Sequence, residues 1–225
     1  RRDALEAAAG MIEGKYGVRA TVIPADLNNP DAPQELSAAT ATEGIEVGIL
    51  INNAGFGLGG EFMETDLERE IEMIQVNVVA VTQLTKLFAP AMVKRRSGRI
   101  MNVASTAGFQ PGPLMSVYYA TKAYVLSFSQ AIAEELRNTG VTVTALCPGA
   151  TATGFADIAQ IGNTRLFQTL GVASAENVAR SGYRAMMRGE RVAIPGWRDK
   201  LMVQSERIVP RRLVTTLSRM VQESR

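Results

Sequence analysis

Hydrophobic and polar positions alternate along this 225-residue chain in blocks whose period switches between that of a helix and that of a strand. Helical patterns cover residues 3–15, 31–43, 65–96, 117–138 and 175–188. Short apolar runs typical of strands lie between and after them, at 18–23, 47–51, 99–104, 141–146 and 191–194. The run 47–51 is almost continuously apolar, which predicts a strand buried on both faces. This alternation predicts an α/β fold, a parallel sheet wrapped by helices that are joined by right-handed crossovers.

Local sequence signals indicate where two of these helices begin or end. Thr65-Asp-Leu-Glu68 has the form of a capping box and predicts the start of the helix over 65–96, while Pro90 predicts a kink within it. Asn138-Thr-Gly140 predicts the end of the helix over 117–138, because glycine readily adopts the left-handed conformation that closes a helix.

Composition favours a single globular domain over residues 1–225 with a sizeable core, since 46% of the residues are hydrophobic. A net charge of only +2 gives no reason to expect a nucleic-acid partner. The lone cysteine, Cys147, cannot form an internal disulfide, and we expect its side chain to be buried in the protein. A single cysteine is consistent with a protein of the reducing cytoplasm, which is where we expect this one. No apolar run reaches about 18 residues, so no membrane span is expected.

The chain contains no histidine, which excludes a Ser-His-Asp triad and an HExxH zinc site. A tyrosine is then the best available proton donor, and Tyr118 stands four residues before Lys122, on the same face of the helix predicted there. Free tyrosine titrates near ~10, and a nearby ammonium favours the phenolate, so we expect Lys122 to lower the pKa of Tyr118. Ser105 follows a predicted strand and offers a hydroxyl. Taken alone, a Tyr and a Lys at this spacing also occur by chance on many helices.

Further motifs stand in order around this trio. They are Asp26-Leu27 after an apolar run, Asn52-Asn53-Ala54-Gly55 after the run 47–51, Asn77, and Pro148-Gly149 followed by Thr151 and Thr153. Over residues 19–155 the chain thereby resembles the short-chain dehydrogenase/reductase family. The amino-acid sequence of residues 102–128 resembles that of the family's DltE-like bacterial subgroup.

The resemblance implies a Rossmann-like, doubly wound parallel sheet in three layers, with NADP or NAD as cofactor. It implies the catalytic set Asn77, Ser105, Tyr118 and Lys122, with Asn77 holding a water that links Lys122 to solvent. A purely structural role for Asn77, satisfying a helix kink, is compatible with this.

The same resemblance implies a set of cofactor-binding residues. Asp26 and Leu27 would meet the adenine, and Asn52, Ala54 and Gly55 would approach the ribose through their backbone. Tyr118 and Lys122 would hold the ribose, Pro148 and Gly149 would form a turn beside the cofactor, and Thr151 and Thr153 would meet the carboxamide.

The chain departs from the family pattern at its start, where the glycine-rich cofactor turn and first strand are absent. About one βαβ unit of roughly 30 residues is missing in front, so we expect either an incomplete sequence, which we favour, or a truncated protein. Arg1 stands where NADP-preferring members place an arginine for the 2′-phosphate, so NADP is expected, with NAD as the alternative. A solvated helix start is the structural alternative for Arg1.

These features predict a carbonyl reductase or alcohol dehydrogenase, and the alternatives are a non-catalytic binding or scaffold protein and an isomerase or dehydratase. The substrate pocket is expected from residues 56–60, 109–115 and Phe155 onward, which favours an apolar ketone, aldehyde or secondary alcohol. Residues 154–172 are expected to form either a substrate lid or a plain loop.

Two features bear on assembly. The tail 197–225 mixes apolar residues with arginines and predicts either a helix packed on its own domain or a sister subunit, which we favour, or an amphipathic arm for a membrane surface or partner. The helices over 66–96 and 117–138 are where family members pair, so a homodimer or homotetramer is expected.

Overall fold

A four-stranded parallel sheet forms the centre of the computed structural model, which describes residues 1–155, 159, 172–205 and 209–222. Its strands stand in the order β1 (Ile49–Asn52), β2 (Gly98–Val103), β3 (Val141–Leu146) and β6 (Val192–Ala193), and each neighbouring pair is parallel. Two further short strands, β4 (Thr151–Ala152) and β5 (Ala173–Ser174), pair with each other.

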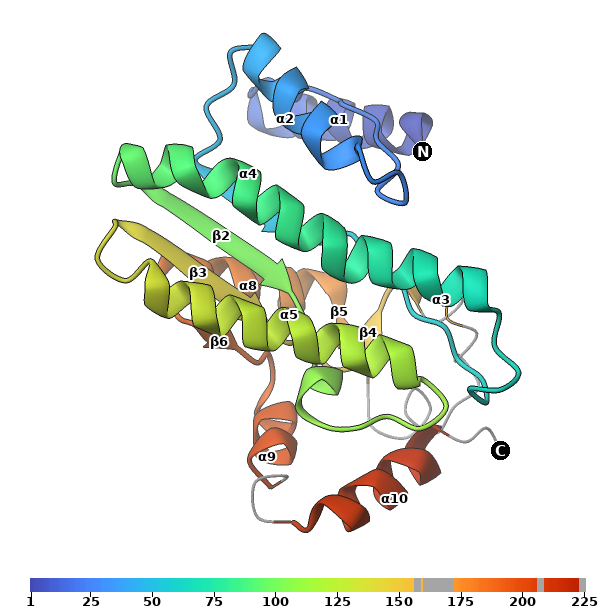
Figure 1. Ribbon diagram of the computed structural model, residues 1–225. Helices are drawn as coiled ribbons and strands as arrows, with labels where there is room; N and C mark the ends of the chain where they lie inside the picture. Colours follow the sequence, from blue (N-terminus) through green and yellow to red (C-terminus); the bar gives the residue numbers. More distant parts are fainter. Residues whose placement is uncertain (156–158, 160–171, 206–208, 223–225) are drawn as a thin grey trace.

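Helices cover both faces of this sheet. Figure 1 shows α4 (Val81–Lys94) and α5 (Ser116–Glu135) across the front of β2 and β3, and α8 (Ala175–Met187) behind them. The three layers and the parallel strands confirm the predicted doubly wound α/β fold.

The alternation of side chains along β2 feeds both layers of the core. Ile100 points to the front layer, where it packs with Met92 of α4 and Val143 of β3. Met101 points to the back layer, where it packs with Leu146 and Met186. One strand therefore anchors the helices on both faces.

A chain of polar side chains also crosses the front layer. Asn52 Nδ2 donates to Asn102 Oδ1 at 2.8 Å and to Thr85 Oγ1 at 3.1 Å. Asn102 Nδ2 donates to Ser129 Oγ at 2.9 Å, and Ser129 Oγ donates to the Val125 carbonyl at 2.6 Å. All four of these polar side chains are buried. They link the ends of β1 and β2 to α4 and α5.

The predicted helix over 65–96 is continuous but irregular. It begins as α3 (Leu67–Ile74), passes through a π-helical turn (Gln75–Ala80) and continues as α4, with Pro90 inside α4. The cap is Asp66, not Thr65: Asp66 Oδ1 accepts from the Arg69 N–H at 2.9 Å. The helix cap therefore lies one residue later than the predicted capping box.

By length and composition alone this helix, Leu67–Lys94, is long and apolar enough to cross a membrane, and it is the one such helix in the described part of the chain. Here it covers the sheet, with Leu84 and Met92 buried. A core helix of a folded domain meets the same criterion.

Two predictions about the N-terminal third are wrong. Residues 18–23 form no strand between α1 (Arg2–Tyr16) and α2 (Ala32–Thr42), because no described segment provides a backbone partner for them. The strand β1 is also not buried on both faces: it pairs only with β2 among the described residues, and Ile49 and Ile51 are 42% and 48% exposed.

The C-terminal tail packs on its own domain. Figure 1 shows α9 (Trp197–Ser205) and α10 (Arg211–Gln222) together beyond the carboxyl ends of the strands. Val203 of α9 and Val214 of α10 are buried. Arg219 of α10 forms an ion pair with Glu61 at 2.7 Å, which ties this helix to the loop after β1.

Candidate active site

A cavity of about 1030 Å³ opens at the carboxyl ends of the strands, between the loops after β1, β2 and β3 and the C-terminal helices. In open parallel sheets this edge is the usual place for ligands. The predicted site residues around it are Arg1, Gly55, Ser105, Tyr118, Lys122, Pro148, Gly149, Thr151 and Thr153.

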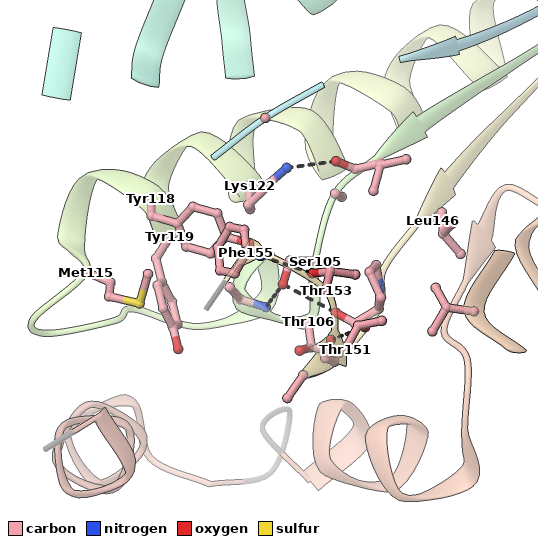
Figure 2. Close-up of a pocket in the computed structure, with 18 of the residues that line it drawn as sticks. Ser105, Thr106, Met115, Tyr118, Tyr119, Lys122, Leu146, Thr151, Thr153 and Phe155 are labelled. Atoms are coloured by element: carbon pink, nitrogen blue, oxygen red, sulfur yellow. Dashed lines mark hydrogen bonds between the residues drawn. The ribbon is translucent and has the colours of Figure 1, made fainter. Parts of the chain in front are cut away.

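The predicted catalytic trio meets at one wall of the cavity (Figure 2). Tyr118 and Lys122 lie one turn apart on α5, and Ser105 lies at the end of β2, where the extended backbone turns into a short 3₁₀ helix (Thr106–Phe109). Ser105 Oγ accepts from the Ala107 N–H at 3.1 Å and lies within 3.3 Å of the Pro148 carbonyl, to which it can donate. It is also within hydrogen-bonding reach of the Tyr118 hydroxyl.

Burial raises the pKa of Tyr118 above its ordinary value, and the hydrogen bond with Ser105 lowers it by a smaller amount. Removing the phenolate from water disfavours the charged form. The expectation that Lys122 gives Tyr118 a lowered pKa is therefore wrong for the protein without cofactor. The Lys122 ammonium lies 5.8 Å from the centroid of the Tyr118 ring. Tyr118 is accordingly a protonated phenol at neutral pH, which is the state of a proton donor.

Lys122 is held in place by its own hydrogen bond. Nζ donates to the Val103 carbonyl at 2.9 Å, and only 5% of the residue is exposed. Burial lowers the pKa of Lys122 to about 8, and attraction to Cys147 offsets part of that change. Cys147 is buried as predicted, and burial raises the pKa of its thiol to about 12.

Asn77 lies in the π-helical turn and is not itself among the residues that line the cavity. Its Oδ1 accepts from the Phe56 N–H at 3.1 Å, and its Nδ2 donates to the Phe56 carbonyl at 2.9 Å and to Thr121 Oγ1 at 3.1 Å. A Cβ at Gly55 would come within 2.8 Å of Asn77 Oδ1, so this loop needs glycine to close on the helix. Asn77 thus joins the loop after β1 to α5, and its role toward water stays a prediction.

The turn after β3 is joined to the serine loop. The Pro148 carbonyl accepts from the Thr106 N–H at 2.9 Å, and Thr151 Oγ1 donates to the Gly149 carbonyl at 2.9 Å. A Cβ at Gly149 would come within 2.7 Å of a carboxylate oxygen of Asp199 on α9. Burial raises the pKa of Asp199.

Several predicted cofactor residues do not line the cavity. Asp26 and Leu27 lie in a turn, where Asp26 Oδ1 accepts from the Asn28 N–H at 3.0 Å. The side chain of Asn52 is turned into the core, and Ala54 is exposed. Their contacts with a cofactor stay predictions. Most of the predicted lid, 154–172, lies outside the described residues.

The residues that α10 and Tyr119 contribute to the cavity were not predicted from the sequence. Val214, Leu217, Ser218 and Gln222 line the cavity, and Gln222 Nε2 donates to the Tyr119 hydroxyl at 2.5 Å. The spacing of 214, 218 and 222 was available as a signal, because residues four apart share a helix face. The pattern gave no indication of which surface that face would meet.

Aromatic and apolar side chains make up most of the wall beside Tyr118. The Phe155 ring lies 5.2 Å from the Tyr118 ring and the Tyr119 ring lies 6.1 Å from it, centroid to centroid. Met115 packs in the same cluster. The charged side chains lining the cavity, in the part of the chain that the structure describes, are Arg1 and Lys122. The arrangement can hold a carbonyl oxygen between two hydroxyl groups in an apolar setting.

Comparison with known proteins gives a consistent picture. Residues 1–161 match the family described as short chain dehydrogenase. The chain is 33% identical over 189 residues to the very-long-chain 3-oxoacyl-CoA reductase of Mus musculus, covering 82% of this chain and 58% of that protein. It is 36% identical over 163 residues to the reductase of the same name from Homo sapiens, covering 70% and 51%. The chain thus spans less than two thirds of these curated relatives.

Solved structures are similar over nearly the whole chain. A short-chain dehydrogenase from Sphingobium yanoikuyae in complex with NADPH superposes with a TM-score of 0.80 at 30% identity, covering 92% of this chain and 81% of that one. A short-chain dehydrogenase/reductase from Burkholderia phymatum in complex with NAD superposes with a TM-score of 0.79 at 26% identity, covering 99% of this chain and 85% of that one. A 7beta-hydroxysteroid dehydrogenase superposes with a TM-score of 0.84 at 26% identity, covering 97% of this chain and 83% of that one.

Proposed function

The chain belongs to the short-chain dehydrogenase/reductase family, and we propose that it acts as a nicotinamide-dependent oxidoreductase that interconverts a carbonyl compound and an alcohol. The observation that carries the proposal is the placement of Ser105 and Lys122 around Tyr118 at one wall of a largely apolar cavity. A non-catalytic scaffold would gain nothing from burying an ammonium and a phenol there. The assignment to the DltE-like subgroup rests on the amino-acid sequence of residues 102–128 and remains part of the proposal.

In the reductive direction, Ser105 Oγ–H donates a hydrogen bond to the substrate oxygen and keeps it within reach of Tyr118. A nicotinamide dinucleotide held in this cavity would supply the hydride to the carbonyl carbon. The Tyr118 hydroxyl gives its proton to the carbonyl oxygen, which leaves a tyrosinate to be reprotonated from solvent. The raised pKa of Tyr118 keeps this proton in place at neutral pH, and it makes the phenol a stronger base in the oxidative direction.

Residues at the cavity fit a dinucleotide. Lys122 presents an ammonium that can bind ribose hydroxyls, and Gly55 has no side chain to obstruct a close approach of its backbone. Thr151 and Thr153 can meet the carboxamide. Arg1 lines the cavity at the start of the chain, where its planar guanidinium can pair with a 2′-phosphate.

We assign NADP as the cofactor, with NAD as the alternative. Two similar solved structures hold NADPH and NADP+, and another holds NAD. The test is kcat/KM with NADPH and with NADH on the full-length protein. Arg1→Gln should reduce the preference for NADPH about tenfold or more, because it removes a charge-assisted pair. Arg2→Gln is the matched control, since Arg2 pairs with Glu6. A clear preference for NADH in the unmodified protein would refute this assignment.

For the substrate, the apolar lining favours a hydrophobic ketone, aldehyde or secondary alcohol. Curated relatives that reduce 3-oxoacyl-CoA support a carbonyl on a long apolar chain. Consumption of NADPH by the full-length protein, followed over a panel of apolar ketones and 3-oxoacyl thioesters, tests the proposal. Failure of every carbonyl compound while NADPH still binds would favour the scaffold alternative.

A further inference from the structure

Two polar side chains of α10 bring buried atoms without a hydrogen-bond partner to the cavity. Ser218 is 6% exposed and Gln222 is 5% exposed, and both line the cavity. Ser218 Oγ and Gln222 Oε1 have no partner within the described structure. Buried polar atoms are nearly always hydrogen-bonded, so two unpaired atoms on the wall of a cavity point to a partner that a ligand supplies.

The position of α10 makes these two atoms part of the cavity wall. Val214, Ser218 and Gln222 follow one another at intervals of four, which puts them on one face of the helix. The ion pair between Arg219 and Glu61 holds the helix against the loop after β1. Ser218 and Gln222 are therefore fixed parts of the wall.

The amide of Gln222 is oriented by Tyr119. Its Nε2 donates to the Tyr119 hydroxyl at 2.5 Å, which leaves Oε1 as a free acceptor. The Tyr119 ring is itself fixed, because it lies against Gly112: a Cβ there would come within 2.2 Å of Tyr119 Cγ. In Figure 2 the Tyr119 hydroxyl points away from Tyr118 and toward the C-terminal helices. The two polar atoms of α10 therefore lie beyond Tyr119 as seen from the reacting group.

Charge narrows the chemistry of a ligand at this place. The charged side chains that line the cavity, within the described ranges, are Arg1 and Lys122, and neither belongs to α10. Arg219 of α10 is already paired with Glu61. The α10 side chains that the structure places in the cavity wall are uncharged and offer no counter-charge to a carboxylate or phosphate. A neutral polar group would find one acceptor there, Gln222 Oε1, and one hydroxyl, Ser218 Oγ.

Building on the proposed function, we propose that Ser218 and Gln222 form a polar subsite for the end of the substrate that lies away from the reacting carbonyl. The ligand group is neutral and has both a donor and an acceptor, as in a hydroxyl or a secondary amide. Its O–H or N–H donates to Gln222 Oε1, and its oxygen accepts from Ser218 Oγ–H. The apolar skeleton between the two ends lies along Tyr119, Met115 and Val214.

Matched ketones test this subsite. The full-length protein with NADPH is given unbranched 2-alkanones over a range of chain lengths, the same ketones with a terminal hydroxyl, and the same ketones with a terminal acetamide. The length that bridges Tyr118 and α10 should show kcat/KM about tenfold higher for a polar-ended ketone than for the plain one. The hydroxyl and acetamide arms identify which group fits.

Two substitutions assign the preference to its residues. Gln222→Leu and Ser218→Ala should each remove most of the preference while leaving kcat/KM for plain alkanones nearly unchanged. Ser218→Ala deletes a single oxygen and keeps the helix sequence favourable, so it remains informative if Gln222→Leu loosens α10. Met220→Gln is the control, because Met220 is 44% exposed and does not line the cavity. No preference at any length, or a preference that survives both substitutions, would overturn the subsite.

Binding measured without turnover separates this inference from the proposed function. Calorimetry on Tyr118→Phe protein with NADPH should show tighter binding of the polar-ended ketones, and this gain should disappear in the double variant with Gln222→Leu. Equal binding of plain and polar-ended ketones refutes the subsite even if ketones are reduced. Selective binding in a protein that reduces none of them supports the subsite and counts against the reductase function alone.

Discussion

The Lys122 ammonium is buried beside one described hydrogen-bond acceptor, the carbonyl of Val103. Keeping this charge away from water disfavours the folded state, and the lowered pKa measures that penalty. The folded protein binds fewer protons at Lys122 than the unfolded chain between pH about 8 and about 10.5. The penalty is therefore fully present below pH 8 and fades as pH rises through this window.

Lys122→Met should therefore stabilise the cofactor-free protein at pH 7. The pKa difference corresponds to about 3 kcal/mol, and loss of the bond to Val103 reduces the gain. The gain should shrink as pH rises from 8 toward 10.5. Urea unfolding at several pH values measures it, with Lys86→Met on the exposed side of α4 as control. A variant less stable than the parent at pH 7 would show that Lys122 is satisfied in place.

Tyr118→Phe removes the only atom through which this residue can move a proton. Turnover should fall at least about a thousandfold, in line with the contribution of general acid–base groups, while cofactor binding changes little. Tyr119→Phe is the matched comparison on the same helix and should keep most of its activity toward plain ketones, because the Tyr119 hydroxyl bonds to Gln222 and points away from Tyr118. Single-turnover rates with NADPH decide this, and an inactive Tyr119→Phe with an active Tyr118→Phe would reverse the assignment.

At the scale of single residues, the sequence was enough to predict the reacting groups but not their protonation equilibria. Spacing and motif were enough to predict that Ser105, Tyr118 and Lys122 would meet. The direction of the pKa of Tyr118 was predicted wrongly, because it depends on how much water the cavity walls remove, and those walls include Phe155 and the distant Gln222.

Among the elements, the π-helical turn has the clearest task. It places Asn77 where one side chain closes three hydrogen bonds to Phe56 and Thr121. A π-helical turn within an α-helix is frequently found at a functional site. Here the extra backbone of the turn positions the loop after β1 against α5.

Asn77→Ala should destabilise the protein by about 2–4 kcal/mol, since it removes the partner of the Phe56 N–H and carbonyl and one of the two bonds of Thr121 Oγ1. The loop after β1 should loosen, and KM for the cofactor should rise. Thermal or urea unfolding gives the stability, and steady-state kinetics gives KM. Asn177→Ala, on the exposed face of α8, is the control and should change neither. A fully stable Asn77→Ala protein would contradict the bridging role.

Most elements were predictable because their periodicity agrees with their environment. The helices α2, α5 and α8, the continuous helix from α3 to α4, and the strands β2 and β3 lie within a few residues of the predicted ranges. The segment 18–23 has the composition of a strand but not its hydrogen bonds, because pairing is a property of two segments and the described residues include no partner for it. A local pattern cannot report whether a neighbour is present.

At the scale of the whole molecule, apolar surface remains on the α3 and α5 side. Leu67 and Ile71 are 70% and 56% exposed, and an apolar groove beside them is lined by Ile74, Val78 and Val117. Other apolar residues of the two helices expected to pair, such as Leu84 and Leu126, are buried in the core.

We still expect a homodimer or homotetramer with closed symmetry through these helices. Light scattering on the full-length protein at micromolar concentration should give an even multiple of the subunit mass. Ile71→Glu should shift it toward monomer by placing a charge in an apolar interface, whereas Glu68→Gln, on the outer turn of the same helix, should not. A monomer in the unmodified protein would rule this assembly out.

The polar chain from Asn52 through Asn102 to Ser129 also has a consequence for how the sequence can change. Each side chain in it satisfies a neighbour, so a single replacement leaves its partner unpaired in the core. Replacing all three, together with Thr85, the fourth member, by apolar residues of similar volume would leave no such orphan. These positions are therefore epistatic: the chain can leave this arrangement easily only by several substitutions together, and a homologue that carries one of them should carry the others.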